Sequence, residues 1–520
     1  MRLVEGADRT SGEPANRDSA EGLRSNKVWI ATAAFAVLIF LVLAIGTALT
    51  LRPNTDEGLF ADPAYTLATK GYMGSPALRD SHQLPRIEQH TYWIFPLDPV
   101  AVAAWYRVFG AGLFSMRSLS ICFGLLGLGA VFIFIQRLSK DVRIASLAVA
   151  LTALDYFYIY GSSSGRMDIM CAALGYAGLA AYMALRERSL SLAIFVSQSL
   201  IVTSGMTHPN GFLYFMGLLF VILYFDRPRL SWRHLALAAI PYVIGASLWG
   251  LYISQDPQAF LRQIRANARD ADRFQGLRNP LLTFVREITV RYGTAYGFGS
   301  HSFGHAGPIF LKALALFAYV AGIIAALSIP ALRRKTEVRV LLALIGLYFF
   351  YLAIFDGQKA YYYLVHFIPM YAALLALFVF WLLADRKLKP IVILLPLSFI
   401  VLVQLAGLAY RIRLNSFKND YMPAVQYLQH NARESQLINA DVDFVFGLGF
   451  PDNLVDDSHM TEIADFFVID EDVAERLKNS RAGNPVVYRH VTGLLANCYE
   501  KVYDFNSIAI YAQKIPRCLH

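Results

Sequence analysis

Charged residues are scarce in this sequence, and cysteine is scarcer. Only 16% of the 520 residues are Asp, Glu, Lys or Arg, whereas 56% are hydrophobic. A single soluble domain needs far more polar surface, so this composition excludes one and indicates a polytopic membrane protein. The sequence has four cysteines and neither a CxxC nor an HExxH pattern, which excludes the common zinc motifs.

The four cysteines fall into two groups. Cys122 and Cys171 lie in apolar segments, where a cysteine behaves as a small core residue. Cys498 and Cys518 lie in the polar C-terminal tail and could pair if that tail is extracytoplasmic, since disulfides persist in oxidising compartments. The sequence leaves this pairing open.

The net charge of +9 does not indicate nucleic-acid binding, because the basic residues gather in short loops between apolar segments. This distribution follows the positive-inside rule for membrane proteins. Residues 1–27 are polar and carry five basic residues, and no small-residue cleavage site clearly follows the first apolar run. We expect an uncleaved membrane anchor behind a cytoplasmic N-terminal tail.

The sequence predicts an all-α polytopic membrane domain over residues 28–410. Apolar segments long enough to cross a bilayer recur about eleven times, near Val28–Thr50, Met116–Ile135, Ile144–Tyr160, Ile169–Leu185, Leu190–Met206, Phe212–Phe225, Leu235–Ile253, Pro308–Ile329, Val340–Phe355, Tyr362–Leu383 and Pro390–Ala409. The shorter segment Pro99–Phe109 is expected to lie on the membrane surface.

The tail, residues 411–520, has a different character and predicts a small extracytoplasmic α/β domain. Met422–Asn431 has a helical pattern, and β-rich runs occur near Gln436–Ala440, Phe466–Ile469, Val486–Tyr488 and Ile508–Tyr511.

Loop charge sets the expected orientation. With a cytoplasmic N-terminus, clusters such as Arg137/Lys140/Arg143 and Arg333/Arg334/Lys335 face inward, whereas the short outer loops hold only Arg166 and Lys359. Counting Pro99–Phe109 as a full span would invert this alternation. Two large loops, residues 51–115 and 254–306, then share the outer side with the tail.

The acidic pair Asp56-Glu57 follows the first span by a few residues, so it must lie near the outer membrane surface. A carboxylate there could deprotonate an acceptor hydroxyl beside a lipid-linked donor. The alternative is an ordinary helix N-cap at Asp56.

Three further outer loops hold candidate site residues. Arg166 and Asp168 must pair, reach water or line a cavity at this depth, so Asp168 is either a second acidic group of the site or half of an interfacial ion pair. His208 could bind a sugar or a phosphate, or merely belong to a turn. Lys359 before the tyrosines Tyr362 and Tyr363 could hold a phosphate, or snorkel within an aromatic belt.

The order of these motifs resembles the GT-C polyprenyl-phosphate-sugar glycosyltransferases, which include protein O-mannosyltransferases and the bacterial aminoarabinose transferase of lipid A. The similarity covers about residues 28–380 and depends on the sequence of motifs, namely Asp56-Glu57 with Tyr65, Tyr92-Trp93, Gly165-Arg166-Met167-Asp168, His208-Pro209-Asn210-Gly211, and Lys359 before Tyr362-Tyr363 and Pro369. One departure is Met73-Gly74-Ser75-Pro76, where many members have Trp-Pro.

The resemblance implies an inverting glycosyltransferase that moves a sugar from a polyprenyl-phosphate carrier to an acceptor hydroxyl on the extracytoplasmic face. It places Asp56 at the family's catalytic acidic position, Asp168 at the second acidic position, Lys359 at the basic residue that faces the donor phosphate, and Glu57 at a recurrent neighbour. No cofactor is required, although a divalent cation could bridge Asp56, Asp168 and the phosphate.

Two alternatives remain open. A lipid-linked-sugar flippase would favour ionisable residues at mid-span, and a Wzy-like polymerase would share the large outer loop but lack the early Asp-Glu pair. The sequence does not name the sugar, the carrier length or the acceptor, which could be a protein, a lipid or a glycan.

Overall fold

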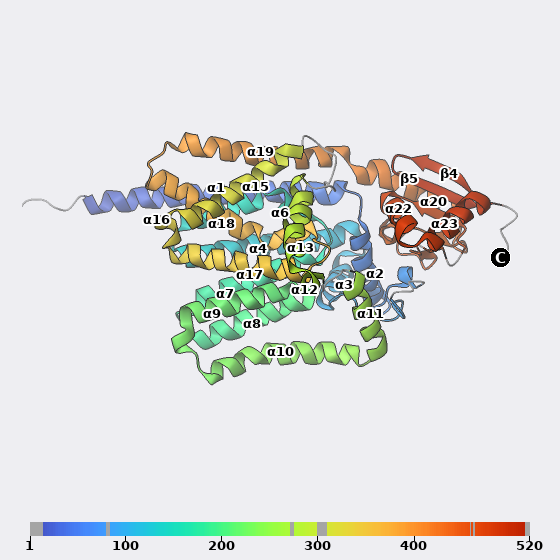
Figure 1. Cartoon of the computed structure of the whole chain (residues 1–520), viewed down its shortest axis with the longest axis horizontal. Coiled ribbons are helices and arrows are strands. Elements are labelled where there is room, and N and C mark those ends of the chain that lie inside the picture. Colours follow the sequence, from blue (N-terminus) through green and yellow to red (C-terminus); the bar gives the residue numbers. More distant parts are fainter. Residues whose placement is uncertain are drawn as a thin grey trace, which may run out of the picture.

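The computed structural model describes residues 14–79, 84–270, 275–298, 309–457, 459–460 and 463–514. Long helices run side by side along one axis, and a small domain with a sheet sits at one end of the bundle (Figure 1). Cys518, one of the two cysteines that could pair in the tail, lies outside the described residues.

Nine helices in the described residues are long and apolar enough to cross a membrane. They are α1 (Pro14–Thr50), α4 (Leu113–Ser139), α7 (Met167–Leu185), α8 (Leu190–Thr207), α9 (Gly211–Asp226), α10 (Trp232–Ile253), α15 (Ile309–Ser328), α17 (Thr336–Phe355) and α19 (Pro390–Leu414). The other two predicted segments are the bent pair described next and α18 (Ile368–Ala384), a shorter apolar helix. The polytopic helical fold predicted from the sequence is therefore confirmed.

The segment predicted as one span near Ile144–Tyr160 is broken. It forms α5 (Val142–Ala153) and α6 (Tyr156–Ser163), which are bent by 64° relative to one another. Asp155 causes the break, because its carboxylate accepts the backbone N–H groups of Phe157 and Tyr158 at 2.8 and 3.2 Å and so caps a new helix. The bend directs the chain from α6 into the Gly165–Asp168 loop.

Several short helices lie outside the spans. The first large loop forms α2 (Thr55–Thr69) and α3 (Leu97–Phe109), so the predicted short segment Pro99–Phe109 is helical. The second large loop forms α11 (Pro257–Asp270), α12 (Gln275–Arg278), α13 (Pro280–Arg286) and α14 (Gly293–Tyr296). A 3₁₀ turn, η4 (Tyr361–His366), leads into α18.

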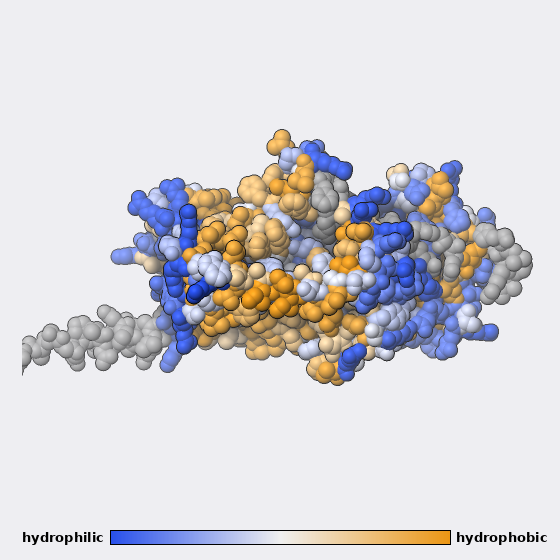
Figure 2. All heavy atoms as spheres, turned by 90° about the horizontal axis from the view of Figure 1, so that it is seen from below, coloured by the Kyte–Doolittle hydropathy of each residue, from blue (hydrophilic) through white to orange (hydrophobic). Residues whose placement is uncertain are grey.

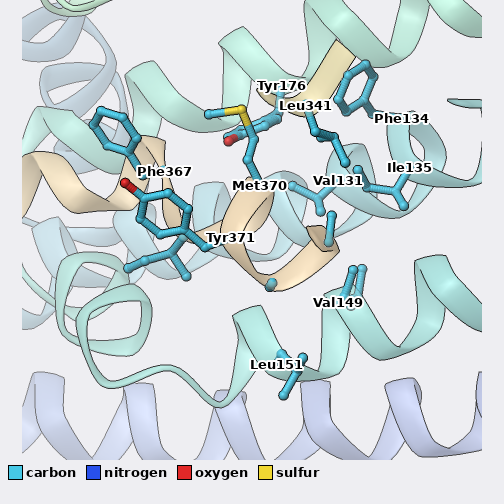
Figure 3. Close-up of a cluster of buried hydrophobic side chains, with 14 of the residues drawn as sticks. Val131, Phe134, Ile135, Val149, Leu151, Tyr176, Leu341, Phe367, Met370 and Tyr371 are labelled. Carbon is cyan, nitrogen blue, oxygen red and sulfur yellow. The ribbon is translucent and has the colours of Figure 1, made fainter. Parts of the chain in front are cut away.

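Apolar side chains cover the middle of the bundle, between a hydrophilic rim at one end and the hydrophilic terminal domain at the other (Figure 2). Inside, α5 and α18 pack between the longer helices, and Figure 3 shows the resulting core. Its buried side chains include Val131 and Phe134 of α4, Leu151 of α5, and Met370 and Tyr371 of α18. The core fixes the helix ends that carry the two large loops.

The C-terminal domain is mixed α/β, as predicted. Its five strands lie in the order β2-β1-β3-β5-β4, with β1 (Ile438–Asn439), β2 (Leu454–Val455), β3 (Phe466–Ile469), β4 (Tyr499–Phe505) and β5 (Ile508–Gln513). The helices are α20 (Met422–Asn431), as predicted, α22 (Glu471–Gly483) and α23 (Pro485–Cys498).

One predicted strand of this domain is wrong, because Val486–Tyr488 lies in the first turns of α23. The Asn484 side chain caps that helix and Pro485 occupies its first position, and together they override the β preference of the two valines. Cys498 is disulfide-bonded.

Candidate active site

The start of α2 carries the acidic pair. Asn54, not Asp56, is the N-cap, because its side chain accepts the Glu57 N–H at 3.1 Å while Glu57 Oε2 accepts the Asn54 N–H at 3.1 Å. This reciprocal capping box fixes the first turn of α2. The alternative role considered for Asp56, an ordinary cap, is thus filled by another residue. The Asp56 side chain keeps 38% of its surface exposed.

Glu57 is fully buried and saturated with hydrogen bonds. Its carboxylate accepts Arg117 Nε and Nη2, each at 2.7 Å, and the Gly165 backbone N–H at 2.7 Å, besides the two groups of Asn54. It therefore ties α2 to α4 and to the loop after α6. These contacts favour a positioning role for Glu57 over the predicted catalytic one.

Arg166 joins the two predicted acidic residues. Its Nη1 donates to Asp56 Oδ2, and its Nε donates to Asp168 Oδ2 at 2.9 Å. The guanidinium carbon lies 3.5 Å from the centre of the Tyr362 ring, a stacked cation–π contact. Asp56, the Arg166–Asp168 loop and Tyr362 come from three separate segments of the chain, and the fold brings these four residues into one cluster. We call these four residues the carboxylate–arginine cluster.

Of the two carboxylates in this cluster only Asp56 is partly exposed, since Asp168 is buried together with Arg166. A buried guanidinium between two carboxylates is compensated on both sides, which removes most of the cost of burying it. The arrangement leaves one carboxylate, Asp56, accessible to a substrate while the rest hold it in place.

His208 borders the cluster. Its Nδ1 accepts the Asn210 N–H at 3.0 Å, so the neutral ring carries its proton on Nε2. That Nε2 lies 3.9 Å from Asp168 Oδ1, an oxygen with no hydrogen-bond partner among the described residues. Tyr363 OH approaches the same nitrogen at 3.4 Å. The structure thus brings the predicted His208 beside Asp168.

The predicted Lys359 lies elsewhere. Its Nζ is 3.2 Å from Glu287 Oε2 and donates to the carbonyl of Ala353 at 2.6 Å, and burial lowers the pKa of this lysine. Glu287 also binds Arg291 at 2.5 Å. Among the described residues, these contacts of Lys359 do not include any member of the carboxylate–arginine cluster. Its assignment to a donor phosphate therefore stays a prediction.

Sequence reasoning missed three buried polar residues near these groups. Asp98 begins α3, and burial together with the charge of Asp168 raises its pKa to about 7. Glu287 and Arg291 form the buried pair behind Lys359. The signals were present but weak: an acid in the first turn of a helix, and a Glu and an Arg four residues apart in an Arg-rich loop.

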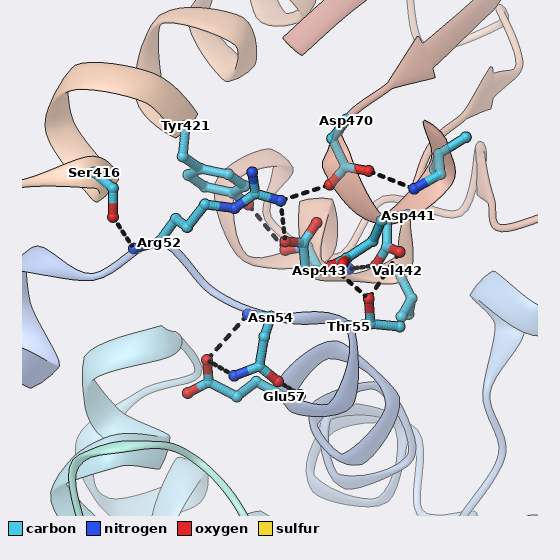
Figure 4. A network of polar contacts seen from close by, with 12 residues as sticks. Arg52, Asn54, Thr55, Glu57, Ser416, Tyr421, Asp441, Val442, Asp443 and Asp470 are labelled. Atoms are coloured by element: carbon cyan, nitrogen blue, oxygen red, sulfur yellow. Dashed lines mark hydrogen bonds and ion pairs between the residues drawn. The ribbon is translucent and has the colours of Figure 1, made fainter. Parts of the chain in front are cut away.

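The C-terminal domain contacts the start of α2 directly (Figure 4). Thr55 Oγ1 donates to Asp441 at 2.9 Å, and Arg52 Nη2 binds Asp470 at 2.6 Å and lies 4.0 Å from Asp443. Burial is the main cause of the raised pKa values of Asp441 and Asp443. We call this set, Arg52 and Thr55 with the three aspartates, the domain latch.

Gly58 closes the same contact, because a Cβ atom there would lie 2.6 Å from the backbone carbonyl of Val442. No side chain fits at that position without moving backbone. The domain therefore packs directly against the turn that holds Asp56.

A bridging metal ion does not fit the cluster as arranged. Arg166 occupies the space between the Asp56 and Asp168 carboxylates with its own guanidinium. Within the described part of the chain, no group of three or more His, Cys, Asp or Glu side chains is placed to hold a metal ion.

Comparison with known proteins supports the fold. No protein-family model matches the sequence, and no curated protein matches it. The structure of ArnT from Cupriavidus metallidurans bound to undecaprenyl phosphate superposes with a TM-score of 0.57 at 14% identity, covering 94% of this chain and 98% of that one.

The oligosaccharyltransferase of Archaeoglobus fulgidus, tethered to an acceptor peptide with the NVT sequon, gives a TM-score of 0.52 at 13% identity, covering 92% of this chain and 74% of that one. Both proteins have the GT-C fold. The resemblance noted in the sequence is thus confirmed at the level of the fold.

Proposed function

We propose that this chain, which has the GT-C fold, is an integral-membrane inverting glycosyltransferase. It moves a sugar from a polyprenyl-phosphate carrier to an acceptor hydroxyl on the extracytoplasmic face of the cell membrane. The N-terminus is then cytoplasmic and the C-terminal domain extracytoplasmic. Similar folds solved with undecaprenyl phosphate and with an acceptor peptide support the choice of substrate classes.

The observation that carries the proposal is Asp56, a partly exposed carboxylate in the first turn of α2, which the buried Arg166 holds in place. As the acceptor hydroxyl attacks the anomeric carbon, Asp56 takes its proton. The bond from that carbon to the phosphate oxygen breaks, and its electron pair leaves on the phosphate. Attack from the side opposite the phosphate inverts the anomeric configuration.

Arg166 supplies the positive charge nearest to this chemistry. It pairs with Asp56 and Asp168. A phosphate that gains a negative charge on leaving would compete with Asp56 for Nη1, since arginine binds phosphate and carboxylate in the same way. Such an exchange would free the Asp56 carboxylate as the phosphate arrives. Stabilisation of developing charge by groups already in place is the largest catalytic term in many enzymes.

Transfer from a labelled polyprenyl-phosphate sugar by purified protein in detergent tests the proposal. Asp56→Asn should lower turnover by roughly 10² to 10⁴, the usual contribution of a general base, with normal expression. Asp504→Asn is the matched control, because Asp504 is an exposed aspartate on β4 that pairs with Lys501 of the same strand. Unchanged transfer in Asp56→Asn would remove Asp56 from the role of base. If the wild type transfers no sugar from a panel of donors to protein, lipid or glycan acceptors, the proposal that this chain is a glycosyltransferase is contradicted.

A further inference from the structure

Part of the second large loop has an exposed apolar face. From α12 to the π-helical turn η3 (Glu287–Tyr292), five apolar side chains keep 46–80% of their surface exposed, namely Leu277, Leu281, Leu282, Val285 and Ile288. Steps of three or four residues relate most of them, so they gather on one side of the helix. We call these five residues the loop apolar face. A run of exposed apolar side chains of this kind marks an interaction surface.

Two charged side chains of η3 lie on the buried side of the same segment. Glu287 and Arg291 have no exposed side-chain surface and pair with each other at 2.5 Å. Arg291 also binds Asp356 at 2.8 Å, and Lys359 Nζ lies 3.2 Å from Glu287. A helix between protein and water has the reverse arrangement, with charges outside and apolar side chains toward the protein. An apolar outer face over a buried ion pair therefore indicates hydrocarbon surroundings.

The contact with α17 gives the depth of this segment. α17 has 20 residues, the length that crosses the hydrocarbon core of a bilayer. The Phe284 ring stacks on Phe349 with the ring centres 6.1 Å apart, and it meets Phe350 edge-on at 5.4 Å. These two rings come about a turn and a half before the end of α17, so Phe284 lies roughly 8 Å inside that end. The middle of α13 is therefore at membrane depth.

The chain enters and leaves this depth on the same side. Before α13, Gly276 lies against the end of α17, where a Cβ atom would meet the Ile354 backbone. After α13, Arg291 binds Asp356, the residue that follows α17. Figure 1 shows α12 and α13 against the bundle, whereas α11 lies nearer to the C-terminal domain. The segment is thus re-entrant, because it dips beside α17 and returns to the end of that helix.

The polar groups of the segment are compatible with lipid. Helical turns follow one another from Pro280 to Tyr296, so the backbone groups are satisfied within the segment, as hydrocarbon requires. The exposed Thr289 hydroxyl donates to the Val285 carbonyl at 3.0 Å. Arg278 and Arg286 flank the loop apolar face, and side chains of that length can extend to the lipid headgroups.

We infer that the loop apolar face is embedded in the bilayer, and that its partners are the acyl chains of lipids in the leaflet on the side of the C-terminal domain. The face continues the lipid-facing surface of α17, because the exposed Phe350 lies directly beside Phe284. One helix thus separates these acyl chains from the buried Glu287–Arg291 pair. The inference does not depend on the proposed transfer reaction. The alternatives are a loop in water and a face covered by a second copy of this chain.

Fluorescence quenching at single cysteines distinguishes these cases in the full-length protein in nanodiscs. Cys122→Ala and Cys171→Ala first remove the free thiols of the described residues. Val285→Cys then probes the loop apolar face, and Leu281→Cys, at its most exposed position, repeats the test. Each new cysteine is labelled with bimane. The two quenchers are iodide in the water and a nitroxide on the acyl chain of the lipid.

Two matched controls use valines of similar exposure. Val243 lies on the spanning helix α10 and Val486 on α23 of the C-terminal domain, and they are 63% and 68% exposed against 56% for Val285. We expect Val285→Cys and Leu281→Cys to follow Val243→Cys, with strong quenching by the nitroxide. Iodide should quench them at least about tenfold less than Val486→Cys, because moving an ion out of water costs more free energy than a tenfold change represents.

Iodide quenching as strong as in Val486→Cys would overturn the inference, since the segment would then lie in water. Weak quenching by both agents would also overturn it, since protein would then cover the face. Thermal unfolding in detergent checks that each variant is folded. With two probe positions, misfolding of one variant leaves the other to decide the test.

Discussion

Glu57→Gln separates a positioning role from a catalytic one at the acidic pair. Glu57 has no exposed surface, and its two oxygens accept five hydrogen bonds, two of them from Arg117. Glutamine keeps the shape but offers one acceptor oxygen and turns an N–H₂ group toward other donors. The substitution also leaves the buried Arg117 without its counter-charge.

Removing one partner of a buried ion pair costs about 3 to 5 kcal/mol, mostly for the charge left behind. We expect Glu57→Gln to lose stability in that range. Arg117→Met alone should lose a comparable amount, because it strands the carboxylate. The double variant should lose clearly less than the sum of the two, since neither charge is then stranded. By contrast, Asp56 is partly exposed and Arg166 keeps Asp168, so Asp56→Asn should change stability little.

The assay is loss of folded protein on heating in detergent, measured beside sugar transfer for the same four variants. The reasoning requires that Glu57→Gln unfolds at a lower temperature and that Asp56→Asn does not. If Glu57→Gln were as stable as the wild type and as inactive as Asp56→Asn, Glu57 would be a catalytic residue and the positioning role would be refuted.

Three further predictions concern the contact between the C-terminal domain and α2, and the role of Lys359. Gly58→Ala should loosen the C-terminal domain, because its Cβ would lie 2.6 Å from the Val442 carbonyl carbon, and limited proteolysis between domain and bundle should accelerate; unchanged proteolysis would contradict this packing. The pKa of Asp441 rises from 3.8 to about 8, chiefly through burial, so the folded domain binds more protons than the unfolded one across that range. The contribution of Asp441 to stability should be fully present in acid, below its ordinary value of 3.8, and be lost as pH rises toward 8, and melting of Asp441→Asn should depend less steeply on pH. Lys359→Met should destabilise the protein by about 3 to 5 kcal/mol if it acts through buried Glu287, whereas a weaker donor affinity with normal stability would favour the phosphate role predicted from the sequence.

Much of the fold was predictable from the sequence, because lipid imposes a simple rule. Backbone groups in a bilayer must be satisfied within the segment, so a long apolar run has little choice but to be a helix. Each predicted apolar segment accordingly corresponds to a helix or, at Ile144–Tyr160, to a pair. The break at Asp155 escaped prediction because one buried carboxylate cap outweighs an apolar pattern only when the surrounding helices hold it there.

The site was predictable as a set of loops but not as a geometry. The spacing of Asp56, Arg166 and Asp168 along the chain predicted that they meet at one end of the bundle, and they do; the chemistry that the motif order implies for them stays a prediction. The sequence could not predict that Asn54 caps α2, that Glu57 forms a buried ion pair with Arg117, or that Lys359 forms one with Glu287. In each case the sequence offers several polar or charged residues as equally plausible partners, and only the fold selects one of them.

The sequence by itself therefore determined the membrane class and the helical architecture, and it predicted that the polar loops gather at one end of the bundle, because hydropathy and loop charge act locally along the chain. Only the tertiary structure decided which carboxylate stays exposed, which cation faces it and what the C-terminal domain touches. Those outcomes depend on which of several possible ion pairs can be buried together without a stranded charge, and that is settled by packing between segments far apart in the sequence.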